Sequence, residues 1–124
     1  MKKARLLVLN PSERKIYEAE CGELNDYYKH LECGCFDITR RKIGGKPYDI
    51  FCDDIGLYAE DPWISAVNEA GDEVMLVGNL IFSNTDSEGN TISLSDDDIK
   101  NIKSNIAHYT TASGRVGIAV MCEY

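Results

Sequence analysis

Short segments with the composition of β-strands recur along the whole chain. They are five to ten residues long, and they are either apolar runs or alternations of polar and apolar residues. Turn-forming residues separate them. Segments this short are stable only when paired with other strands, so the chain is constrained to a fold built around a sheet. The predicted strands are residues 4–9, 14–20, 35–39, 48–52, 63–67, 73–82 and 115–122.

Two further segments repeat their apolar residues at the spacing of an α-helix. The first, residues 23–33, is followed by Gly34, a residue that commonly ends helices. The second, residues 96–110, is preceded by Ser95, a suitable N-cap that forms a capping-box pattern with Asp98. The residues that mark the buried faces are Leu24, Tyr27, Tyr28 and Leu31 in the first helix and Ile99, Ile102, Ile106 and Tyr109 in the second.

These elements predict a single α+β domain that spans residues 1–124. Their order is ββαβ, then ββ, then αβ, which predicts a mixed or antiparallel sheet of about six or seven strands carrying two helices. The segment at 40–47 is expected to be a flexible basic connection and residues 83–91 a polar loop. Gly78 is expected to form a bulge within the strand at 73–82.

Charge is segregated along the chain. The segment from Pro47 to Ile99, here called the base-free segment, contains thirteen acidic residues and no Lys, Arg or His. The rest of the chain has eight acidic and thirteen basic residues, so it is net positive although the whole chain has a net charge of −8. Turns, a polar loop and a helix start account for some of these carboxylates. Local structure does not require that bases are absent from this segment. We interpret their absence as a functional feature.

Composition excludes several classes of function. The net charge of −8 argues against binding duplex nucleic acid or an anionic membrane with the whole surface, and it favours a basic partner. No apolar run approaches the roughly twenty residues of a membrane span. The apolar part of MKKARLLVLNP is short and ends at Pro11, so it does not match a signal peptide. The five cysteines are expected to be free thiols in a reducing cytoplasm.

The sequence contains no recognisable catalytic or metal-binding pattern. Cys33-Gly34-Cys35 has a single residue between its thiols, and neither histidine lies at ligand spacing from the other. The loop from Asn84 to Gly89 matches the first half of a calcium loop, but its twelfth position is Ser95 and a strand precedes it. Ser-His-Asp, nucleophile-elbow and HExxH arrangements are also missing. We therefore predict a non-enzymatic protein with structural thiols and without a metal or cofactor.

Two parts of the base-free segment are candidates for contact with a basic protein. The first surrounds Glu60-Asp61-Pro62, where Tyr58 and Trp63 could anchor a partner. The second is Asp96-Asp97-Asp98, because three carboxylates exceed what the dipole of a helix start needs. The predicted partner-binding residues are Asp53, Asp54, Tyr58, Glu60, Asp61, Trp63, Asp96, Asp97 and Asp98.

Basic residues outside that segment allow a different interpretation. Arg40, Arg41, Lys46 and Arg115 could hold the phosphate of a small nucleotide signal, although the glycines before Lys46 lack the spacing of a phosphate loop. The same bases could instead pair with the base-free segment, within one chain or across a homodimer. Sequestration of a nucleotide and a structural role in a homo-oligomer therefore stand as alternatives to protein binding.

Several segments resemble a known family. A domain-of-unknown-function family of small acidic proteins resembles this chain in four segments. In sequence order they are YDIFCDDIGLYAEDP, VGNLIF, the turn DSEGN and SLSDDDI. The resemblance covers about residues 6–102, and such proteins are encoded by phages and conjugative elements of low-GC Gram-positive bacteria. It implies no activity and no catalytic residue, but it implies a cytoplasmic accessory protein of a mobile element. By analogy, we expect an inhibitor of host defence, of the DNA-mimic or anti-CRISPR kind, that contacts a basic protein and neither nucleic acid nor membrane.

Overall fold

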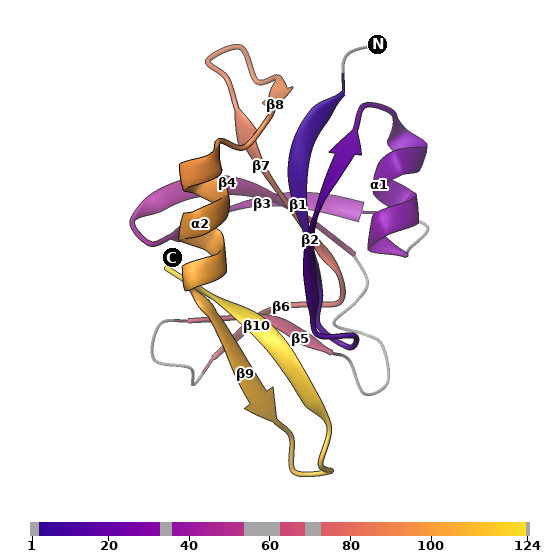
Figure 1. Ribbon diagram of the computed structural model, residues 1–124, viewed down its shortest axis with the longest axis vertical. Coiled ribbons are helices and arrows are strands. Elements are labelled where there is room, and N and C mark those ends of the chain that lie inside the picture. Colours follow the sequence, from indigo (N-terminus) through magenta and orange to yellow (C-terminus); the bar gives the residue numbers. More distant parts are fainter. Residues whose placement is uncertain (1–2, 33–35, 54–62, 69–72, 124) are drawn as a thin grey trace.

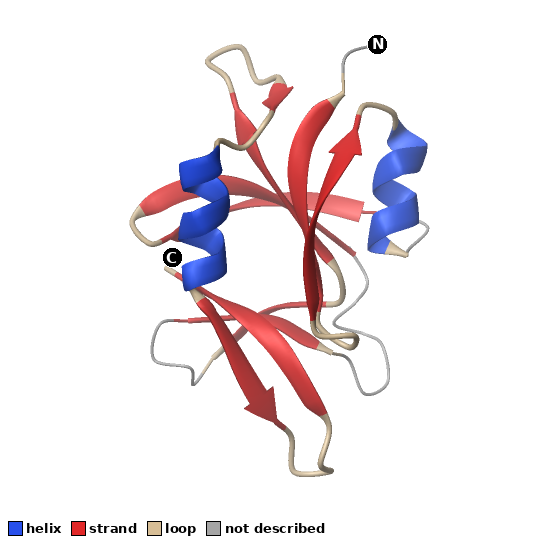
Figure 2. Ribbon diagram, viewed as in Figure 1, coloured by secondary structure: helices blue, strands red, loops and turns tan. Residues whose placement is uncertain are grey.

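The computed structural model describes residues 3–32, 36–53, 63–68 and 73–123. Within these ranges the chain forms two helices and ten strands arranged in two sheets (Figure 1, Figure 2). The α+β class and the two helices are confirmed. The strands are β1 (Ala4–Asn10), β2 (Lys15–Cys21), β3 (Phe36–Ile43), β4 (Lys46–Asp53), β5 (Ile64–Asn68), β6 (Val74–Val77), β7 (Leu80–Thr85), β8 (Thr91–Ile92), β9 (Ile106–Thr110) and β10 (Val116–Cys122), and the helices are α1 (Leu24–Leu31) and α2 (Asp96–Ser104).

The larger sheet has six strands, in the order β2-β1-β7-β4-β3, and β8 adds to it by pairing with the far part of β7. Every pair in it is antiparallel. Leu80 of β7 lies opposite Leu9 of β1 on one side and Cys52 of β4 on the other. Segments from three distant parts of the sequence therefore meet at β7.

The smaller sheet has four strands in the order β6-β5-β10-β9. β10 pairs in parallel with β5 and antiparallel with β9. A bridge between Lys42 and Glu123 joins the end of the chain to β3 of the larger sheet, with Glu123 N donating to Lys42 O at 2.7 Å. The two sheets are thus connected by hydrogen bonds as well as by packing.

The central strands of the larger sheet are buried on both faces. Leu6, Leu7, Val8 and Leu9 of β1 are all fully buried, which explains why this strand is a continuous apolar run. Alternate residues contribute to different cores. Leu7 and Leu9 pack with the smaller sheet and α2, whereas Leu6 and Val8 pack on the side of α1.

Helix α1 covers one face of the larger sheet. Leu31 is its buried anchor, and the ring of Tyr27 lies 4.6 Å from that of Phe51 in β4. Phe36 at the start of β3 completes the aromatic cluster, with its centroid 5.6 Å from that of Phe51. The helix begins at Leu24 because Asp26 accepts hydrogen bonds from the backbone N–H groups of residues 22 and 23.

Helix α2 and the smaller sheet cover the opposite face. Ile99 and Ile102 of α2 join Ile118 and Val120 of β10 in one apolar core with Phe82 of β7. Figure 1 shows α2 beside β4 and above the smaller sheet. The start of α2 is therefore held close to the larger sheet. None of the described helices has the length and apolar content that a membrane crossing requires.

The ten described strands form two sheets where one sheet of six or seven strands was predicted, and three details of the strands and their connections also differ from the sequence-based expectations. The apolar run at 73–82 is two strands, because Gly78 adopts φ +79° and turns the chain from the smaller sheet into the larger one. Residues 40–47 are no flexible connection, since β3 and β4 continue to a tight hairpin at Gly44-Gly45, both with positive φ. The expected loop at 83–91 is shorter, because β7 extends to Thr85 and pairs with β8.

The second helix ends six residues earlier than predicted. Asn105 caps it by donating to Ile102 O, and Asn105 O then accepts a hydrogen bond from Met121 N of β10. The chain continues as β9, in which Ile106 lies opposite Val120. Tyr109 therefore belongs to a strand, where its hydroxyl donates to Ile64 O at 2.7 Å. Pairing with β10 outweighs the helical spacing of these apolar residues.

Candidate functional site

The first turn of α2 places three consecutive aspartates in three different environments. Ser95 is the N-cap, and its side chain accepts a hydrogen bond from Asp98 N while Asp98 accepts one from Ser95 N. The predicted capping box is thus confirmed. It turns the Asp98 side chain back toward the body of the protein, and it leaves Asp96 and Asp97 exposed.

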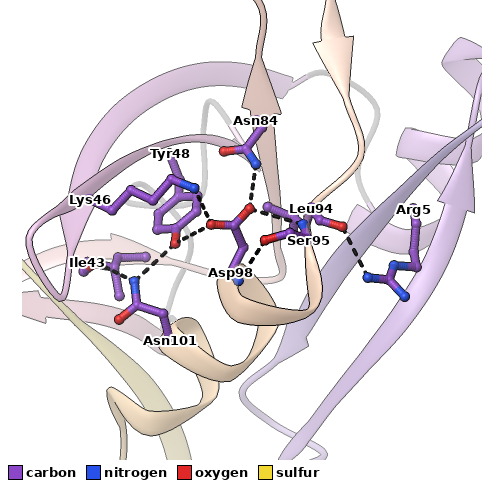
Figure 3. Close-up of polar contacts among 9 residues, drawn as sticks. All are labelled: Arg5, Ile43, Lys46, Tyr48, Asn84, Leu94, Ser95, Asp98 and Asn101. Carbon is purple, nitrogen blue, oxygen red and sulfur yellow. Dashed lines mark hydrogen bonds and ion pairs between the residues drawn. The ribbon is translucent and has the colours of Figure 1, made fainter.

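Asp98 is the centre of a buried polar cluster that joins α2 to the larger sheet (Figure 3). Its Oδ1 pairs with Lys46 Nζ and accepts a hydrogen bond from the Tyr48 hydroxyl at 3.0 Å. Its Oδ2 accepts from Asn84 Nδ2 at 2.7 Å and from Ser95 N at 3.0 Å. A carboxylate offers about four acceptor positions, so Asp98 has none left for a ligand.

Asn101, one turn further along α2, completes this cluster. Its Nδ2 donates to Ile43 O at 2.8 Å and to the Tyr48 hydroxyl at 3.0 Å. The Tyr48 hydroxyl therefore accepts from Asn101 and donates to Asp98 (Figure 3). The cluster joins the β3–β4 hairpin, the end of β7 and α2 into one unit.

The protonation states agree with this structural role. Burial raises the pKa of Asp98, but hydrogen bonds from Lys46, Ser95 and Asn84 outweigh it and hold the pKa well below the usual range. Burial also raises the pKa of Tyr48 to about 12, and the contact with Asp98 acts in the same direction. Asp98 is thus a permanent anion at neutral pH and Tyr48 a permanent donor, so the pair is poorly suited to general acid–base catalysis.

Burial removes Asp98 from the predicted partner-binding residues. It is 3% exposed, whereas the side chain of Asp96 is 91% exposed. The sequence-based expectation treated the three aspartates as one surface cluster. It is corrected by the capping box, since a carboxylate at the third helical position points back over the N-cap.

Four carboxylates of the base-free segment lie at one end of the molecule: Glu88, Asp96 and Asp97 are exposed and Asp86 is half-buried. Asp96 and Asp97 begin α2, and Asp86 and Glu88 lie in the loop between β7 and β8, at the same end in Figure 1. We call these four residues the acidic tip. Asn84, near the end of β7, donates to Asp98 and so holds the start of this loop against the start of α2.

Neutralisation of the acidic tip is incomplete. Asp96 pairs with Arg5 Nη2 at 2.7 Å, and Arg5 also lies 3.5 Å from Glu18. Among the described residues, no cation pairs with Glu88, Asp97 or Asp86. The tip can therefore offer carboxylates to a cationic surface.

The calcium-like loop is a backbone turn. Asp86 Oδ1 accepts from Glu88 N and Asn90 N, both at 2.9 Å, and these bonds lower the pKa of Asp86, the Asn90 N–H foremost. Gly89 adopts φ +85° in the same turn. In the described part of the chain, no group of three or more His, Cys, Asp or Glu side chains could hold a metal ion.

The other predicted contact residues are scattered. Asp53 lies half-buried at the end of β4, opposite Phe36. Trp63 lies just before β5, and the guanidinium of Arg115 stacks 3.8 Å from its ring centroid. This contact therefore joins Trp63, a predicted partner-binding residue, to Arg115, a predicted phosphate-binding residue. Asp54, Tyr58, Glu60 and Asp61 lie outside the described residues.

The four predicted phosphate-binding residues do not form one site. Lys46 pairs with Asp98, and Arg40 Nε pairs with Asp49 at 3.1 Å. Arg41 is next to Arg40 on β3 and so points to the opposite face, where it donates to Thr39 Oγ1. Arg115 belongs to the smaller sheet, on Trp63. Two of these bases thus neutralise acids of the base-free segment within the same chain.

The described cysteines are structural. Cys21, Cys52 and Cys122 are buried and reduced. Burial raises the pKa of Cys21 to about 11 and that of Cys122 to about 12. Both are thiols at neutral pH and poor nucleophiles. The pair Cys33 and Cys35 lies outside the described residues.

Comparison with known families supports one part of the resemblance, a family of unknown function. A family model described as a domain of unknown function, DUF3846, matches residues 1–107. The chain belongs to the DUF3846 family. The match extends over α1, α2 and the larger sheet, so it contains the whole acidic tip and the cluster around Asp98. A search of curated proteins and a search of solved structures each found no match to this DUF3846 chain.

Proposed function

We propose that this DUF3846 chain is a non-enzymatic binding protein whose acidic tip contacts a basic surface of another protein. The observation that carries the proposal is the exposure of Glu88, Asp96 and Asp97 next to a carboxylate that is fully used inside the fold. Asp98 anchors the acidic tip to the fold, and the neighbouring Asp96 and Asp97 remain available for contact with a partner.

Charge segregation supports the same interpretation. Lys46 and Arg40 neutralise buried or half-buried acids of the base-free segment, but Glu88 and Asp97 receive no such partner among the described residues. Complementary charge would speed association with a basic protein and would be screened by salt. A rigid support also favours binding, because the polar cluster around Asp98 orders the acidic tip before a partner binds.

We further propose a biological setting. The resemblance to proteins of phages and conjugative elements supports an accessory role inside a bacterial host cell. A nucleic-acid-binding defence protein has the basic surface that this proposal requires, and exposed carboxylates could occupy the positions of phosphates on it. In this proposal the chain acts as an inhibitor of the DNA-mimic kind.

The proposal is tested with two double variants of equal charge. Glu88→Gln with Asp97→Asn removes two carboxylates from the acidic tip. Glu13→Gln with Asp37→Asn removes two exposed carboxylates elsewhere, in the β1–β2 turn and on β3. Tagged wild-type and variant proteins are used to capture proteins from a bacterial lysate at low and high salt.

A basic protein captured by the wild type and by the control variant, but lost with the tip variant and at high salt, supports the proposal. Equal capture by all three proteins would show that the acidic tip is not the contact surface. Equal loss with both variants would show that only the net charge matters.

A further inference from the structure

A groove lies on the opposite side of the larger sheet from α2, where α1 ends. Its volume is about 780 Å³, and it lies between the β1–β2 turn and the last turn of α1. The side chains that the argument needs are Arg14, Lys15 and Tyr17 from the turn and β2, and Lys29 and His30 from α1. None of these residues belongs to the acidic tip.

The groove exists because the helix is shorter than the strand beside it. Eight helical residues span about 12 Å, whereas a seven-residue strand spans about 23 Å. Figure 1 shows α1 running along β2 and ending before the β1–β2 turn. The start of β2 therefore extends beyond the end of the helix. Lys15 and Tyr17 lie opposite Asn10 and Val8, on the face of the sheet that α1 only partly covers.

The groove has three cations and two acids, so its charge balance is positive, in contrast to the protein as a whole. Three of the thirteen Lys and Arg residues line it, against two of the twenty-one acids. Both acids already have partners: Glu13 lies 3.3 Å from Lys15, and Glu32 accepts from Asn79 Nδ2 at 2.7 Å. Among the described residues, Arg14 and Lys29 have no ion pair. This local excess of positive charge suits an anionic ligand.

Two rings form one wall of the groove. The Tyr17 hydroxyl and His30 Nδ1 are 2.9 Å apart, and this hydrogen bond fixes both rings. Tyr17 is 37% exposed, so it is accessible to a ligand from solvent. Burial, followed by the charge of Lys29, lowers the pKa of His30, so its ring is neutral at pH 7. An exposed ring beside free cations offers a surface for stacking as well as for charge.

Hydrogen bonds from side chains to the backbone hold both walls of the groove. Arg14 adopts φ 55°, and its Nη1 donates to Val116 O at 3.3 Å, which ties the β1–β2 turn to β10. On the helix side, Asn79 Nδ2 donates to both His30 O and Glu32 Oε2. The β1–β2 turn and the last turn of α1, which carry these cations and the His30 ring, are therefore held on either side of the groove.

We propose that this groove binds a small phosphorylated ligand with a planar ring, of the mononucleotide class. Lys15, Lys29 and Arg14 hold the phosphate, and the ring of Tyr17 stacks against the base. The volume lies within the range of about 300–1,000 Å³ that small-molecule sites occupy.

Isothermal titration calorimetry of the full chain tests the proposal with four probes: AMP, GMP, adenosine and inorganic phosphate. We expect heat of binding with AMP or GMP and a much weaker signal with adenosine or phosphate alone. Lys15→Gln with Lys29→Gln should weaken nucleotide binding about tenfold or more, since each lost charge-assisted contact weakens affinity. Tyr17→Leu should weaken the nucleotide but leave phosphate unchanged.

The matched control is Lys100→Gln with Lys103→Gln, which removes two exposed lysines from α2. It should leave nucleotide affinity unchanged, and far-ultraviolet circular dichroism should show that both double variants are folded. Three results would overturn the proposal: no binding of AMP or GMP at millimolar concentration, equal weakening by the control variant, or phosphate binding as tightly as the nucleotides. None of these results affects the acidic tip.

Discussion

At the residue scale, two adjacent aspartates show how position on a helix decides what a carboxylate does. Asp97 is exposed and has no ion pair with any described residue, whereas Asp98 is buried and accepts from four groups. Removing charge from Asp98 leaves the ammonium of Lys46 without its partner and weakens the bonds from Tyr48 and Asn84. Removing it from Asp97 leaves every internal contact in place.

We therefore expect Asp98→Asn to lower the free energy of unfolding by about 2–3 kcal/mol. This is less than the 3–5 kcal/mol typical of a broken buried pair, because Lys46 is half exposed to water. Asp97→Asn, the control, should change the free energy by no more than about 1 kcal/mol, through the helix dipole. Urea denaturation measures both values. Similar effects of the two substitutions would contradict the structural role of Asp98.

The same carboxylate predicts a dependence of stability on pH. Its pKa in the folded protein is lowered below that of an unfolded aspartate, about 3.9, so its contribution is complete above about pH 5. The contribution is lost as the pH falls through 4 toward the folded value. The difference in free energy of unfolding between wild type and Asp98→Asn should therefore shrink from pH 7 to pH 3. A difference that is the same at both pH values would be inconsistent with this titration.

The sequence predicted part of this cluster. The capping box between Ser95 and Asp98 is a local pattern, and it places the carboxylate at the N-cap. Lys46 and Tyr48 are fifty or more residues away along the chain. Their approach depends on the pairing of β4 with β7 and on how α2 packs, and neither leaves a local signal. For this reason Asp98, which is a buried structural residue, was predicted to be a surface contact.

At the scale of elements, the β3–β4 hairpin depends on two glycines with different surroundings. Gly44 has φ +58°, and a Cβ atom there would overlap the Asn101 side chain of α2. Gly45 has φ +84° and open space around it. The positive φ angle disfavours a side chain at both positions. Only at Gly44 does the missing side chain also allow α2 to approach closely.

Gly45→Ala should therefore destabilise the protein by about 1 kcal/mol, the smaller end of the cost of a left-handed conformation. Gly44→Ala should cost about 3 kcal/mol, because Asn101 must also move and lose its bonds to Ile43 O and Tyr48. Thermal denaturation of the two variants measures the difference. Equal melting temperatures would show that the contact between the hairpin and α2 contributes little.

Elements whose patterns are local were predicted best. The start of the second helix follows from its capping box, that of the first follows from the spacing of its apolar residues, and β1 follows from its continuous apolar run. The division of residues 73–82 at Gly78 was missed, because both halves are apolar and only the three-dimensional path assigns them to different sheets. β9 was missed because Ile106 and Tyr109 also fit helical spacing, and the partner strand β10 decides between the two.

At the scale of the molecule, one apolar core joins the two sheets. Leu7, Leu9 and Phe82 of the larger sheet pack with Ala66 and Val120 of the smaller one. Neither sheet can lose its partner without exposing this core to water. We therefore expect both sheets to unfold in a single transition.

Trp63, the single tryptophan, reports on the smaller sheet by fluorescence, whereas far-ultraviolet circular dichroism reports on all strands and helices. The two urea unfolding curves should have the same midpoint. Leu7→Ala, at the centre of β1, should shift both midpoints together and lower stability by about 2–5 kcal/mol. A separate fluorescence transition at lower urea would show that the smaller sheet unfolds independently.

Charge distribution at this scale leads to the central claim, that the acidic tip recognises a basic protein. The most direct test is the association rate constant with a captured partner, measured for wild type, Glu88→Gln/Asp97→Asn and Glu13→Gln/Asp37→Asn over a range of salt concentrations. Steering by the tip predicts a several-fold slower association and a weaker salt dependence for the first variant, with the second close to wild type. The same rate and salt dependence for both variants would contradict the claim.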